Sequence, residues 1–351
     1  MGFRPRAVES VVNFWQNKRV LLTGHTGFKG TWMALVLQRL GAEVTGIALE
    51  PEGSPNLYNL TAPKIKSYII DIRDRERFVK MAQSANTEIV IHMAAQALVR
   101  RSYEMPVDTF ATNVMGSVYL LEALVGKDAT ILVVTSDKVY KNDEFGRNFK
   151  ESDALGGDDP YSASKAAAEI AVHSWAKSFG GKIATARAGN VIGGGDFSED
   201  RLLPDAFRAY TNDTPLILRN PNATRPWQHV LDVTFGYLKY AELLHNDYEN
   251  TPKSLNFGPN GKNLTVRETI DIFCDALEKK IPVKISPDNK KLEKTRLELD
   301  VALAKKLGFK NSISQKDAVH MAGIWYKKFH AGQSSLQLTI NEIKNYLDSY
   351  A

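Results

Sequence analysis

The segment that most constrains how this chain folds is a glycine-rich loop close to its beginning. A β-branched run from Arg19 to Thr23 leads into Gly24-His25-Thr26-Gly27-Phe28-Lys29-Gly30, and a helical pattern follows from Thr31 to Leu40. Glycines spaced as G-x-x-G-x-x-G let backbone N–H groups approach a pyrophosphate, and a helix N-terminus adds positive potential there. The loop therefore predicts a dinucleotide site after the first strand of a parallel sheet.

The rest of the first half repeats the same alternation of strand and helix. Further strands are predicted at 43–49, 67–70, 88–93, 129–135 and 182–187. Amphipathic helices are predicted between them at 75–85, 107–125 and 162–179. Continuous apolar strands that alternate with helices are typical of a parallel sheet covered on both faces. The predicted fold class is α/β, a doubly wound parallel Rossmann sheet.

The pattern changes after Asn190. Segments rich in glycine, proline and asparagine, such as VIGGGDFSEDRLLPD and NFGPNGKNLT, separate shorter helices. This change predicts a dinucleotide-binding domain over residues 1–190 and a smaller substrate-binding lobe over residues 191–351, with an interleaved boundary.

Composition narrows the function classes. The 45 basic and 40 acidic residues leave a net charge of +5. Much of the excess lies between Lys279 and Lys316, where Phe309 is the single aromatic residue, and a nucleic-acid reader should interleave its basic residues with exposed aromatics, so we expect no nucleic-acid partner. The sequence shows no apolar run of about 18 residues and no signal peptide, so we expect a cytoplasmic protein without a membrane partner. A single cysteine, Cys274, and the lack of Cys and His clusters predict no metal site.

A catalytic group is predicted around Ser136, Tyr161 and Lys165. Tyrosine and lysine spaced as Y-x-x-x-K lie one helical turn apart, so the ammonium can lower the pKa of the phenol and make it a base. Ser136, at the end of the fifth strand, adds a hydroxyl.

Residues at other strand ends are candidates for cofactor binding. Asp71 and Ile72 follow the third strand, and Ala94 and Ala95 follow the fourth. An acidic residue normally ends the second strand and binds the adenosine ribose, but here Glu50 arrives late.

These motifs resemble those of the extended short-chain dehydrogenase/reductase family, and more narrowly the nucleotide-sugar 4,6-dehydratases. The resemblance covers most of the chain through GHTGFKG, HMAAQALVR, TSDKVY, YSASK, RAGNVIGGGD and RPWQHVLD. Among these enzymes, the motifs most resemble those of dehydratases that act on CDP-glucose. The resemblance implies NAD as cofactor, with Asn113 added to the cofactor site, and a role in deoxysugar biosynthesis for lipopolysaccharide O-antigen. The helices predicted at 107–125 and 162–179 carry small and apolar residues that suit close helix packing, so we expect a homodimer or a dimer of dimers.

The resemblance also implies roles for the two residues after Ser136. Tyr161 would take the proton of the C4 hydroxyl while NAD takes the hydride. Lys138 would then remove the C5 proton, and Asp137 would protonate the departing C6 hydroxyl. An ordinary reductase lacks such an adjacent acid and base.

Substrate contacts are expected from residues after the fourth strand and from loops of the second lobe. Arginine suits a pyrophosphate because its planar fork donates two hydrogen bonds. The candidates are Gln96, Arg100, Asn190, Arg201, Arg225, His229, Asn256 and Glu293.

Three alternatives stay open. The substrate could be another nucleotide-hexose, because Leu292 stands where the resemblance implies a histidine before Glu293. The enzyme could be a nucleotide-sugar 4-epimerase, which needs neither Asp137 nor Lys138. The chain could also be a cofactor-sensing binding protein, although such proteins commonly lose the catalytic tyrosine or lysine.

Overall fold

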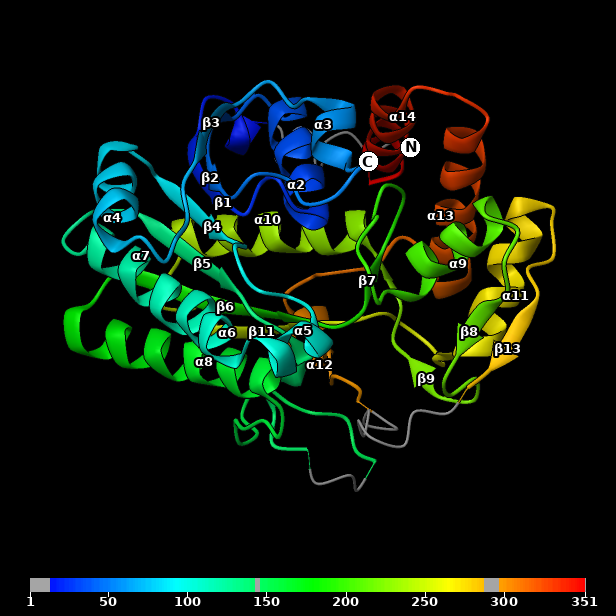
Figure 1. Ribbon diagram of the computed structural model, residues 1–351. Coiled ribbons are helices and arrows are strands. Elements are labelled where there is room, and N and C mark those ends of the chain that lie inside the picture. The colour runs from blue at the N-terminus through cyan, green and yellow to red at the C-terminus, as the bar shows by residue number, and fades with distance from the viewer. Residues whose placement is uncertain (1–12, 143–145, 287–296, 351) are drawn as a thin grey trace, which may run out of the picture.

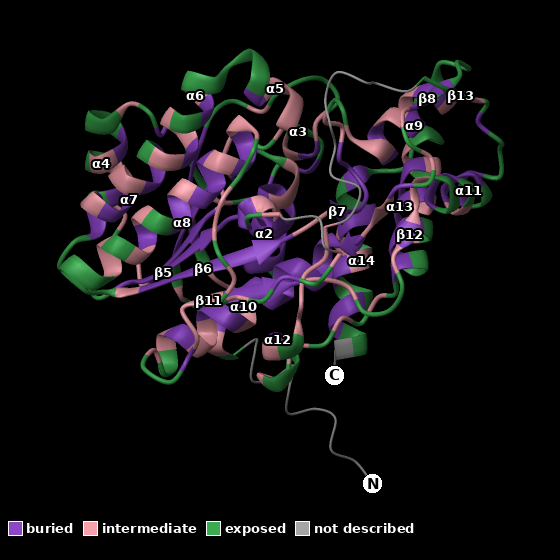
Figure 2. Ribbon diagram, turned by 90° about the horizontal axis from the view of Figure 1, so that it is seen from below, coloured by how far each residue is buried: buried purple, intermediate pink, exposed green. Residues whose placement is uncertain are grey.

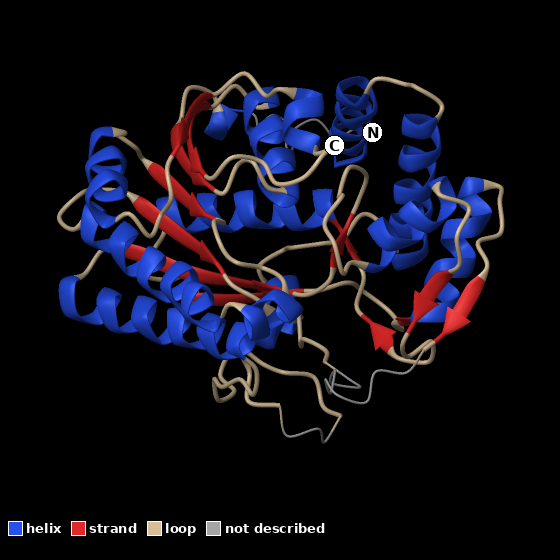
Figure 3. Cartoon of the chain, viewed as in Figure 1, coloured by secondary structure: helices blue, strands red, loops and turns tan. Residues whose placement is uncertain are grey.

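The structure is a computed structural model that describes residues 13–142, 146–286 and 297–350. Within these residues the central element is a seven-stranded parallel sheet in the order β11-β6-β5-β4-β1-β2-β3 (Figures 1 and 3). The strands are β1 (Arg19–Thr23), β2 (Glu43–Ala48), β3 (Lys66–Ile69), β4 (Ile89–His92), β5 (Thr130–Val134), β6 (Lys182–Ala188) and β11 (Ser254–Phe257). The strand order reverses between β1 and β4, which opens a crevice at their carboxyl ends. The predicted doubly wound fold is confirmed.

Helices cover both faces of the sheet because side chains alternate along each strand. Leu22 and Ile91 face the layer that contains α2 (Phe28–Arg39) and α10 (Val230–Asn246). Leu21 and Val90 face the opposite layer. That layer contains α4 (Arg75–Ser84), α7 (Gly116–Leu124) and α8 (Pro160–Phe179). Figure 2 shows the sheet strands as buried ribbon between helices with exposed outer surfaces.

Short helices bridge the ends of the strands. They are α3 (Leu57–Thr61), α5 (Val99–Glu104), α6 (Pro106–Phe110) and a π-helical segment at Ala111–Met115, which runs on into α7. A 3-10 turn at Asp137–Val139 follows β5.

The smaller lobe lies beside the carboxyl ends of the strands (Figure 1). Its helices are α9 (Leu202–Thr211), α11 (Val266–Leu277), α12 (Ala302–Lys306), α13 (Gln315–His330) and α14 (Ser335–Tyr350). Short strands pair in its described part, β7 (Val191–Ile192) with β10 (Gln228–His229), β9 (Thr224–Arg225) with β12 (Leu264–Thr265), and β8 (Leu216–Leu218) with β13 (Val283–Ile285).

The two lobes are interleaved along the chain. Helix α10 and strand β11 follow residue 190 in sequence, yet both belong to the large sheet and its covering layer. Helix α14 packs back onto α2 and α3. Among the described residues, no helix is both long and apolar enough to cross a bilayer.

Candidate active site

The glycine-rich loop joins β1 to α2 by close backbone packing. Gly24 has a φ of +77°, and a Cβ there would lie 2.7 Å from the Ala94 nitrogen. A Cβ on Gly30 would lie 2.0 Å from the Gly24 oxygen, so both positions exclude a side chain. At Gly27, the N-cap of α2, a Cβ would meet only the Gly24 oxygen, at 3.5 Å. The helix N-terminus is therefore open to an anion, and the loop fits the pyrophosphate of a dinucleotide.

His25 turns inward from this loop. Its Nε2 lies 2.7 Å from the Ser67 hydroxyl oxygen, its ring meets Tyr58 edge-on, and burial lowers its pKa to about 4. Thr26 donates from Oγ1 to the Leu49 carbonyl at 2.8 Å. Both residues thus tie the loop to the second and third strands.

Lys29 lies within electrostatic range of Asp137 and Lys165, two residues of the predicted catalytic group. Burial lowers its pKa to about 8, the Arg201 charge adds to this shift, and Asp137 and Asp196 oppose it. Phe28 lies near the carboxyl end of β7, because a Cβ on Gly193 would come within 3.5 Å of its ring.

The predicted adenine side carries a surface ion triad. Arg73 pairs with Asp71 and with Asp108, at 2.6 Å in each case. Ile72 is buried against Gly116, where a Cβ would lie 2.4 Å from its Cδ1. Glu50, the late acidic residue, is exposed.

Asn113 connects the end of β4 to α8 from within the π-helical turn. Its Oδ1 accepts from the Gln96 backbone N–H at 2.9 Å, and its Nδ2 donates to the Gln96 carbonyl and to the Ser164 hydroxyl. The Gln96 side chain is engaged with Leu98 and Thr109. Gln96 and Asn113 therefore shape the loop that contains Ala94 and Ala95.

The residues after β5 form a compact polar turn. The Ser136 hydroxyl donates to Asp137 Oδ1 at 3.0 Å and accepts from the Lys138 backbone N–H at 3.2 Å. Asp137 is 3% exposed, and burial raises its pKa against the opposing effects of the Lys138 charge, the Ser136 hydrogen bond and the Arg225 charge. A buried carboxyl with a raised pKa is suited to carry a proton.

Tyr161 and Lys165 lie in the first two turns of α8, as predicted from their spacing. Burial raises the pKa of Tyr161, and the neighbouring Ser136 hydroxyl opposes that shift. Lys165 donates from Nζ to the Val134 carbonyl at 3.3 Å, and burial followed by the Lys29 charge lowers its pKa to about 7. The expectation that Lys165 lowers the pKa of Tyr161 is not met here, because burial outweighs every neighbouring charge.

A buried network beneath this group was not predicted from the sequence. Glu169, one turn after Lys165, accepts two hydrogen bonds from Arg187 of β6, at 3.0 and 2.8 Å. Arg187 also donates to the Tyr140 hydroxyl, which donates to Asn256 Oδ1 at 2.7 Å. The only sequence signal was the spacing of Tyr161, Lys165 and Glu169, which places all three on one helix face.

Three arginines lie near the crevice from different elements. Arg100 of α5 pairs with Asp200 at 3.5 Å, and Arg201 donates to the Ala97 carbonyl. Arg225 of β9 lies close enough to Asp137 to lower its pKa. Asn190 follows β6, and its carbonyl accepts a hydrogen bond from the Gln228 backbone N–H at 2.9 Å.

Two predicted substrate residues are not brought to the crevice. His229 is fully buried as the N-cap of α10, where it accepts from the Leu231 backbone N–H. Asn256 is fully buried, and its amide donates to the Phe149 and Asp300 carbonyls. Glu293 lies outside the described residues.

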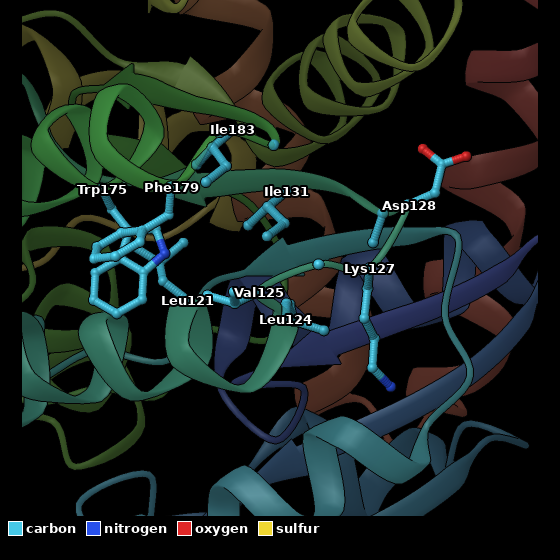
Figure 4. Close-up of a pocket in the computed structure, with 13 residues that line it drawn as sticks. Leu121, Leu124, Val125, Lys127, Asp128, Ile131, Trp175, Phe179 and Ile183 are labelled. Carbon is cyan, nitrogen blue, oxygen red and sulfur yellow. The ribbon is translucent and has the colours of Figure 1, made fainter.

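A separate hollow of about 320 Å³ lies at the amino ends of β5 and β6, the edge of the sheet opposite the crevice. Figure 4 shows Trp175 and Phe179 of α8 there, near Leu121 and Val125. The polar residues described above contribute nothing to it.

Comparisons with known proteins agree with this geometry. The chain is 39% identical to CDP-glucose 4,6-dehydratase of Salmonella typhimurium over 96% of its own length and 98% of that protein. The structure of the dTDP-glucose 4,6-dehydratase DesIV from Streptomyces venezuelae, with NAD and TYD bound, superposes with a TM-score of 0.78 at 25% identity, covering 91% of this chain and 99% of that one.

A third comparison bears on the fold alone. The epimerase Mth375 of Methanothermobacter thermautotrophicus superposes with a TM-score of 0.81 at 21% identity, covering 94% of this chain and 98% of that one. The family profile described as "NAD dependent epimerase/dehydratase family" matches residues 20–258. This match spans the glycine-rich loop, the polar turn after β5 and the helix that contains Tyr161 and Lys165, so the chain belongs to the NAD dependent epimerase/dehydratase family.

Proposed function

We propose that this protein is a CDP-glucose 4,6-dehydratase, a hydro-lyase that makes CDP-4-keto-6-deoxy-glucose. The observation that carries the proposal is the turn in which the buried Asp137, hydrogen-bonded to Ser136, is followed directly by Lys138. The 39% identity to the Salmonella enzyme over nearly the whole chain supports the choice of substrate. Such a product suits a role in deoxysugar biosynthesis.

The loop from Gly24 to Gly30 would hold the pyrophosphate of NAD at the N-terminus of α2. Lys29 and Lys165, two partly neutralised lysines, would lie beside its negative charges. Bound there, NAD would supply a reversible hydride acceptor for the oxidation at C4 and the reduction at C6 of the hexose. Asp71 and Ile72 would border its adenine, and Ala94 and Ala95 would line its path across β4.

The proton transfers fall to the chain's own side chains. Tyr161 Oη would receive the proton of the C4 hydroxyl. Lys138 Nζ would take the C5 proton, which the C4 ketone acidifies, and would return it to C5 after water is lost. Asp137, buried with a raised pKa, would protonate the C6 oxygen as the C6–O bond breaks. The Lys138 and Arg225 charges nearby would stabilise the carboxylate that remains.

Arginines around the crevice would bind the diphosphate of the nucleotide sugar. Arg225 is the strongest candidate because its charge acts on Asp137. Arg100 and Arg201, which contact Asp200 and the Ala97 carbonyl, are the other candidates. Gln96 and Asn190 would help to form the wall of the substrate site through their backbone. His229 and Asn256, both fully buried, would support the site from behind.

We also infer that two copies of the chain pair through α6, α7 and α8, and that the enzyme acts in the cytoplasm. Support for pairing is a set of apolar side chains left exposed on α6, on α8 and on the π-helical segment between α6 and α7. They are Val107 (79% exposed), Ile170 (59%), Met115 (41%) and Phe110 (39%).

The deciding experiment offers the purified protein NAD with CDP-, dTDP-, GDP- and UDP-glucose in turn. A product lighter by one water, with a 4-keto group, is expected from CDP-glucose. Loss of water from another nucleotide-hexose alone would reassign the substrate. A C4-inverted sugar of unchanged mass would instead identify a 4-epimerase.

A further inference from the structure

Two groups of side chains must act on one sugar in the proposed reaction. Tyr161 and Lys165 of α8 would serve the oxidation at C4. Asp137 and Lys138, in the polar turn after β5 (residues 136–139), would remove water across C5 and C6. These carbons are consecutive in the sugar, and a misplacement of about 1 Å can slow a step by about a hundredfold. The polar turn must therefore be held firmly relative to α8.

The residues on either side of the polar turn are both attached to one buried ion pair. Glu169 of α8 and Arg187 of β6 are 0% and 1% exposed, and two hydrogen bonds of 3.0 and 2.8 Å join them. Thr135, immediately before the turn, donates from Oγ1 to Glu169 Oε1 at 2.5 Å. Tyr140, immediately after the turn, accepts at its hydroxyl oxygen from Arg187 Nη1 at 2.8 Å. The ion pair thus holds both ends of the turn at once.

Strand β6, which carries the arginine, also contacts the turn between these two ends. Gly189 directly follows β6, and a Cβ there would lie 2.8 Å from Asp137 Oδ2. The Thr135 backbone N–H donates to the Ala186 carbonyl at 2.8 Å. The turn therefore packs on β6 near its beginning, at its buried acid and at its end.

The guanidinium of Arg187 has five N–H donors, and each has an acceptor. Two of them donate to the Glu169 carboxylate. The other three donate to the Tyr140 hydroxyl, the Glu151 carbonyl and the Ser254 hydroxyl. A buried ion pair is often no more stabilising than apolar residues of similar volume, so stability alone does not explain why this pair lies here. A fully bonded pair does fix direction and spacing.

We propose that the Glu169–Arg187 ion pair positions the polar turn relative to α8, an inference that rests on the proposed function. Tyr161, Lys165 and Glu169 are spaced four residues apart, so the helix that presents the oxidation groups also carries the anchor of the turn. Through the two residues that flank the turn, this anchor sets where the proposed acid and base lie. Both members of the pair are too buried to touch a substrate, so they are positioning residues and not catalytic residues.

The test uses two anchor variants, which leave the ion pair itself intact. Tyr140→Phe removes the hydroxyl that joins the turn to Arg187, and keeps the ring that stacks on Phe149. Thr135→Val removes the hydroxyl that joins the turn to Glu169. Both variants should fold, whereas removal of either charge would leave the other buried and unpaired.

The two chemical steps are then followed separately on rapid mixing of the NAD-loaded enzyme with CDP-glucose. Near-ultraviolet absorbance reports the reduction of bound NAD, and the mass of the sugar in quenched samples reports the loss of water. Reduction of NAD should stay near the wild-type rate in both anchor variants, because α8 keeps the oxidation groups in place. Loss of water should slow by about tenfold to a hundredfold, as expected for a displacement of up to about 1 Å. Bound NADH should therefore accumulate.

Three further variants make the comparison specific. Thr185→Val removes another hydroxyl that donates to the Glu169 carboxylate, at 2.7 Å, but Thr185 lies in the middle of β6. Tyr240→Phe removes a buried phenol hydroxyl of α10 that donates to the Pro252 carbonyl. These two controls should keep the wild-type ratio of the two rates, even where their unfolding temperatures fall. Thr135→Ser keeps the hydroxyl and should restore that ratio.

Amide hydrogen exchange of the peptide 135–140 adds a readout that needs no turnover. Lys138 and Val139 donate their backbone N–H groups to Ser136 within the turn, so their exchange reports how firmly the turn is held. Exchange of this peptide should be about fivefold faster in the anchor variants, the effect of one lost hydrogen bond, and unchanged in the two controls.

Three results would overturn the positioning role. They are wild-type rates for both steps in the anchor variants, an equal fall in both steps, which would leave the ion pair a purely structural role, and unchanged exchange of the turn. The proposed function is decided separately by the wild type, which would lose no water if it were not a dehydratase. In that case the exchange of the turn would still decide whether the ion pair holds it.

Discussion

Burial changes the pKa of two lysines at the predicted cofactor site, Lys29 within the glycine-rich loop and Lys165 in α8. Burial is the main cause that lowers the pKa of Lys29 to about 8 and of Lys165 to about 7, and each ammonium lies in the field of other cations. Near neutral pH both therefore carry less than a full positive charge. A bound pyrophosphate would favour the charged form of each and raise both pKa values.

This predicts that the enzyme takes up protons when it binds NAD. Binding of NAD should be measured by titration calorimetry at about pH 7.5 in buffers of different ionisation enthalpy. The apparent binding enthalpy should vary with the buffer, and its slope against the buffer's ionisation enthalpy should have the sign of proton uptake by the protein. Lys29→Met should reduce the uptake and weaken NAD binding. A binding enthalpy that is the same in all buffers would contradict the assignment of these lysines to the cofactor site.

Lys138 is the residue at which the dehydratase and epimerase interpretations differ. Lys138→Ala removes the proposed C5 base but leaves Tyr161, Ser136 and Asp137 in place. The variant should still reduce bound NAD on mixing with CDP-glucose, seen by near-ultraviolet absorbance, and should then stall before water is lost. We expect product formation to fall about a thousandfold, equivalent to about 4 kcal/mol in the barrier.

Lys141→Ala serves as the matched control for Lys138→Ala, because Lys141 is exposed three residues further along the same segment. It should form product at the wild-type rate. Product formation at that rate in Lys138→Ala would remove Lys138 from the mechanism.

At the scale of elements, the strands of the first half could be predicted because each is an apolar, β-branched run that ends at a turn residue. Strands β1, β2 and β5 appear within one residue of their predicted bounds. Strand β11 was missed, because Ser254–Phe257 is short and leads into a segment rich in glycine and proline. The two-residue strands of the smaller lobe carry too little pattern to predict.

The residues of the candidate site also fall into those that the sequence could predict and those that it could not. Gly24, Tyr161 and Lys165 could be found by spacing, because spacing along one strand or helix is a local property. The burial of Asn256 could not be found, because its partners Tyr140, Phe149 and Asp300 are far from it in sequence. Polar residues that stabilise a site from behind and those that face a ligand have the same sequence signal.

The β1-α2 junction offers a prediction that separates packing from anion binding. Gly30→Ala places a Cβ 2.0 Å from the Gly24 oxygen, whereas in Gly27→Ala the nearest atom would be 3.5 Å away. Gly30→Ala should lower the unfolding temperature and abolish NAD binding. Gly27→Ala should keep the unfolding temperature of the free protein but weaken NAD binding, measured by calorimetry. Equal unfolding temperatures for the two variants would argue against this packing.

Helix α14 docks through an unusual pair, Glu342 with the buried His229, whose Oε2 and Nε2 atoms lie 3.7 Å apart. Burial raises the pKa of Glu342 to about 8, so the folded state binds its proton more tightly than the unfolded chain does. This contribution to stability is present below about pH 4.5, the unfolded value, and is lost as the pH rises through 8.

Glu342→Gln should therefore flatten the fall in unfolding temperature between about pH 5 and pH 8, and raise the unfolding temperature at the alkaline end. Glu249→Gln, at an exposed carboxylate on the surface, is the matched control and should leave the curve unchanged. A Glu342→Gln curve parallel to that of the wild type would show that this carboxyl is not held neutral in the fold.

At the scale of the whole molecule, the proposed pairing of two copies would involve the outer surface of the layer that contains α6, α7 and α8. Val107 and Ile170 are 79% and 59% exposed there, and α6 packs directly on α8, so their apolar surfaces adjoin. Pairing two such surfaces about a twofold axis would form a four-helix interface and remove them from water. The crevice lies at the carboxyl edge of the sheet, so each copy would keep its own active site.

Light scattering at micromolar concentration should therefore give the mass of a dimer, or of a dimer of dimers. Val107→Glu combined with Ile170→Glu should shift the protein toward the monomer, because two copies would bring four carboxylates into an apolar contact and burying an unpaired charge is costly. Ile217→Glu, at a 60% exposed isoleucine of the smaller lobe, is the matched control and should remain a dimer. A wild-type monomer would contradict the proposed pairing. A double variant that still dimerises would show that the interface does not involve these helices. Dissociation by Ile217→Glu would place the interface on the smaller lobe instead.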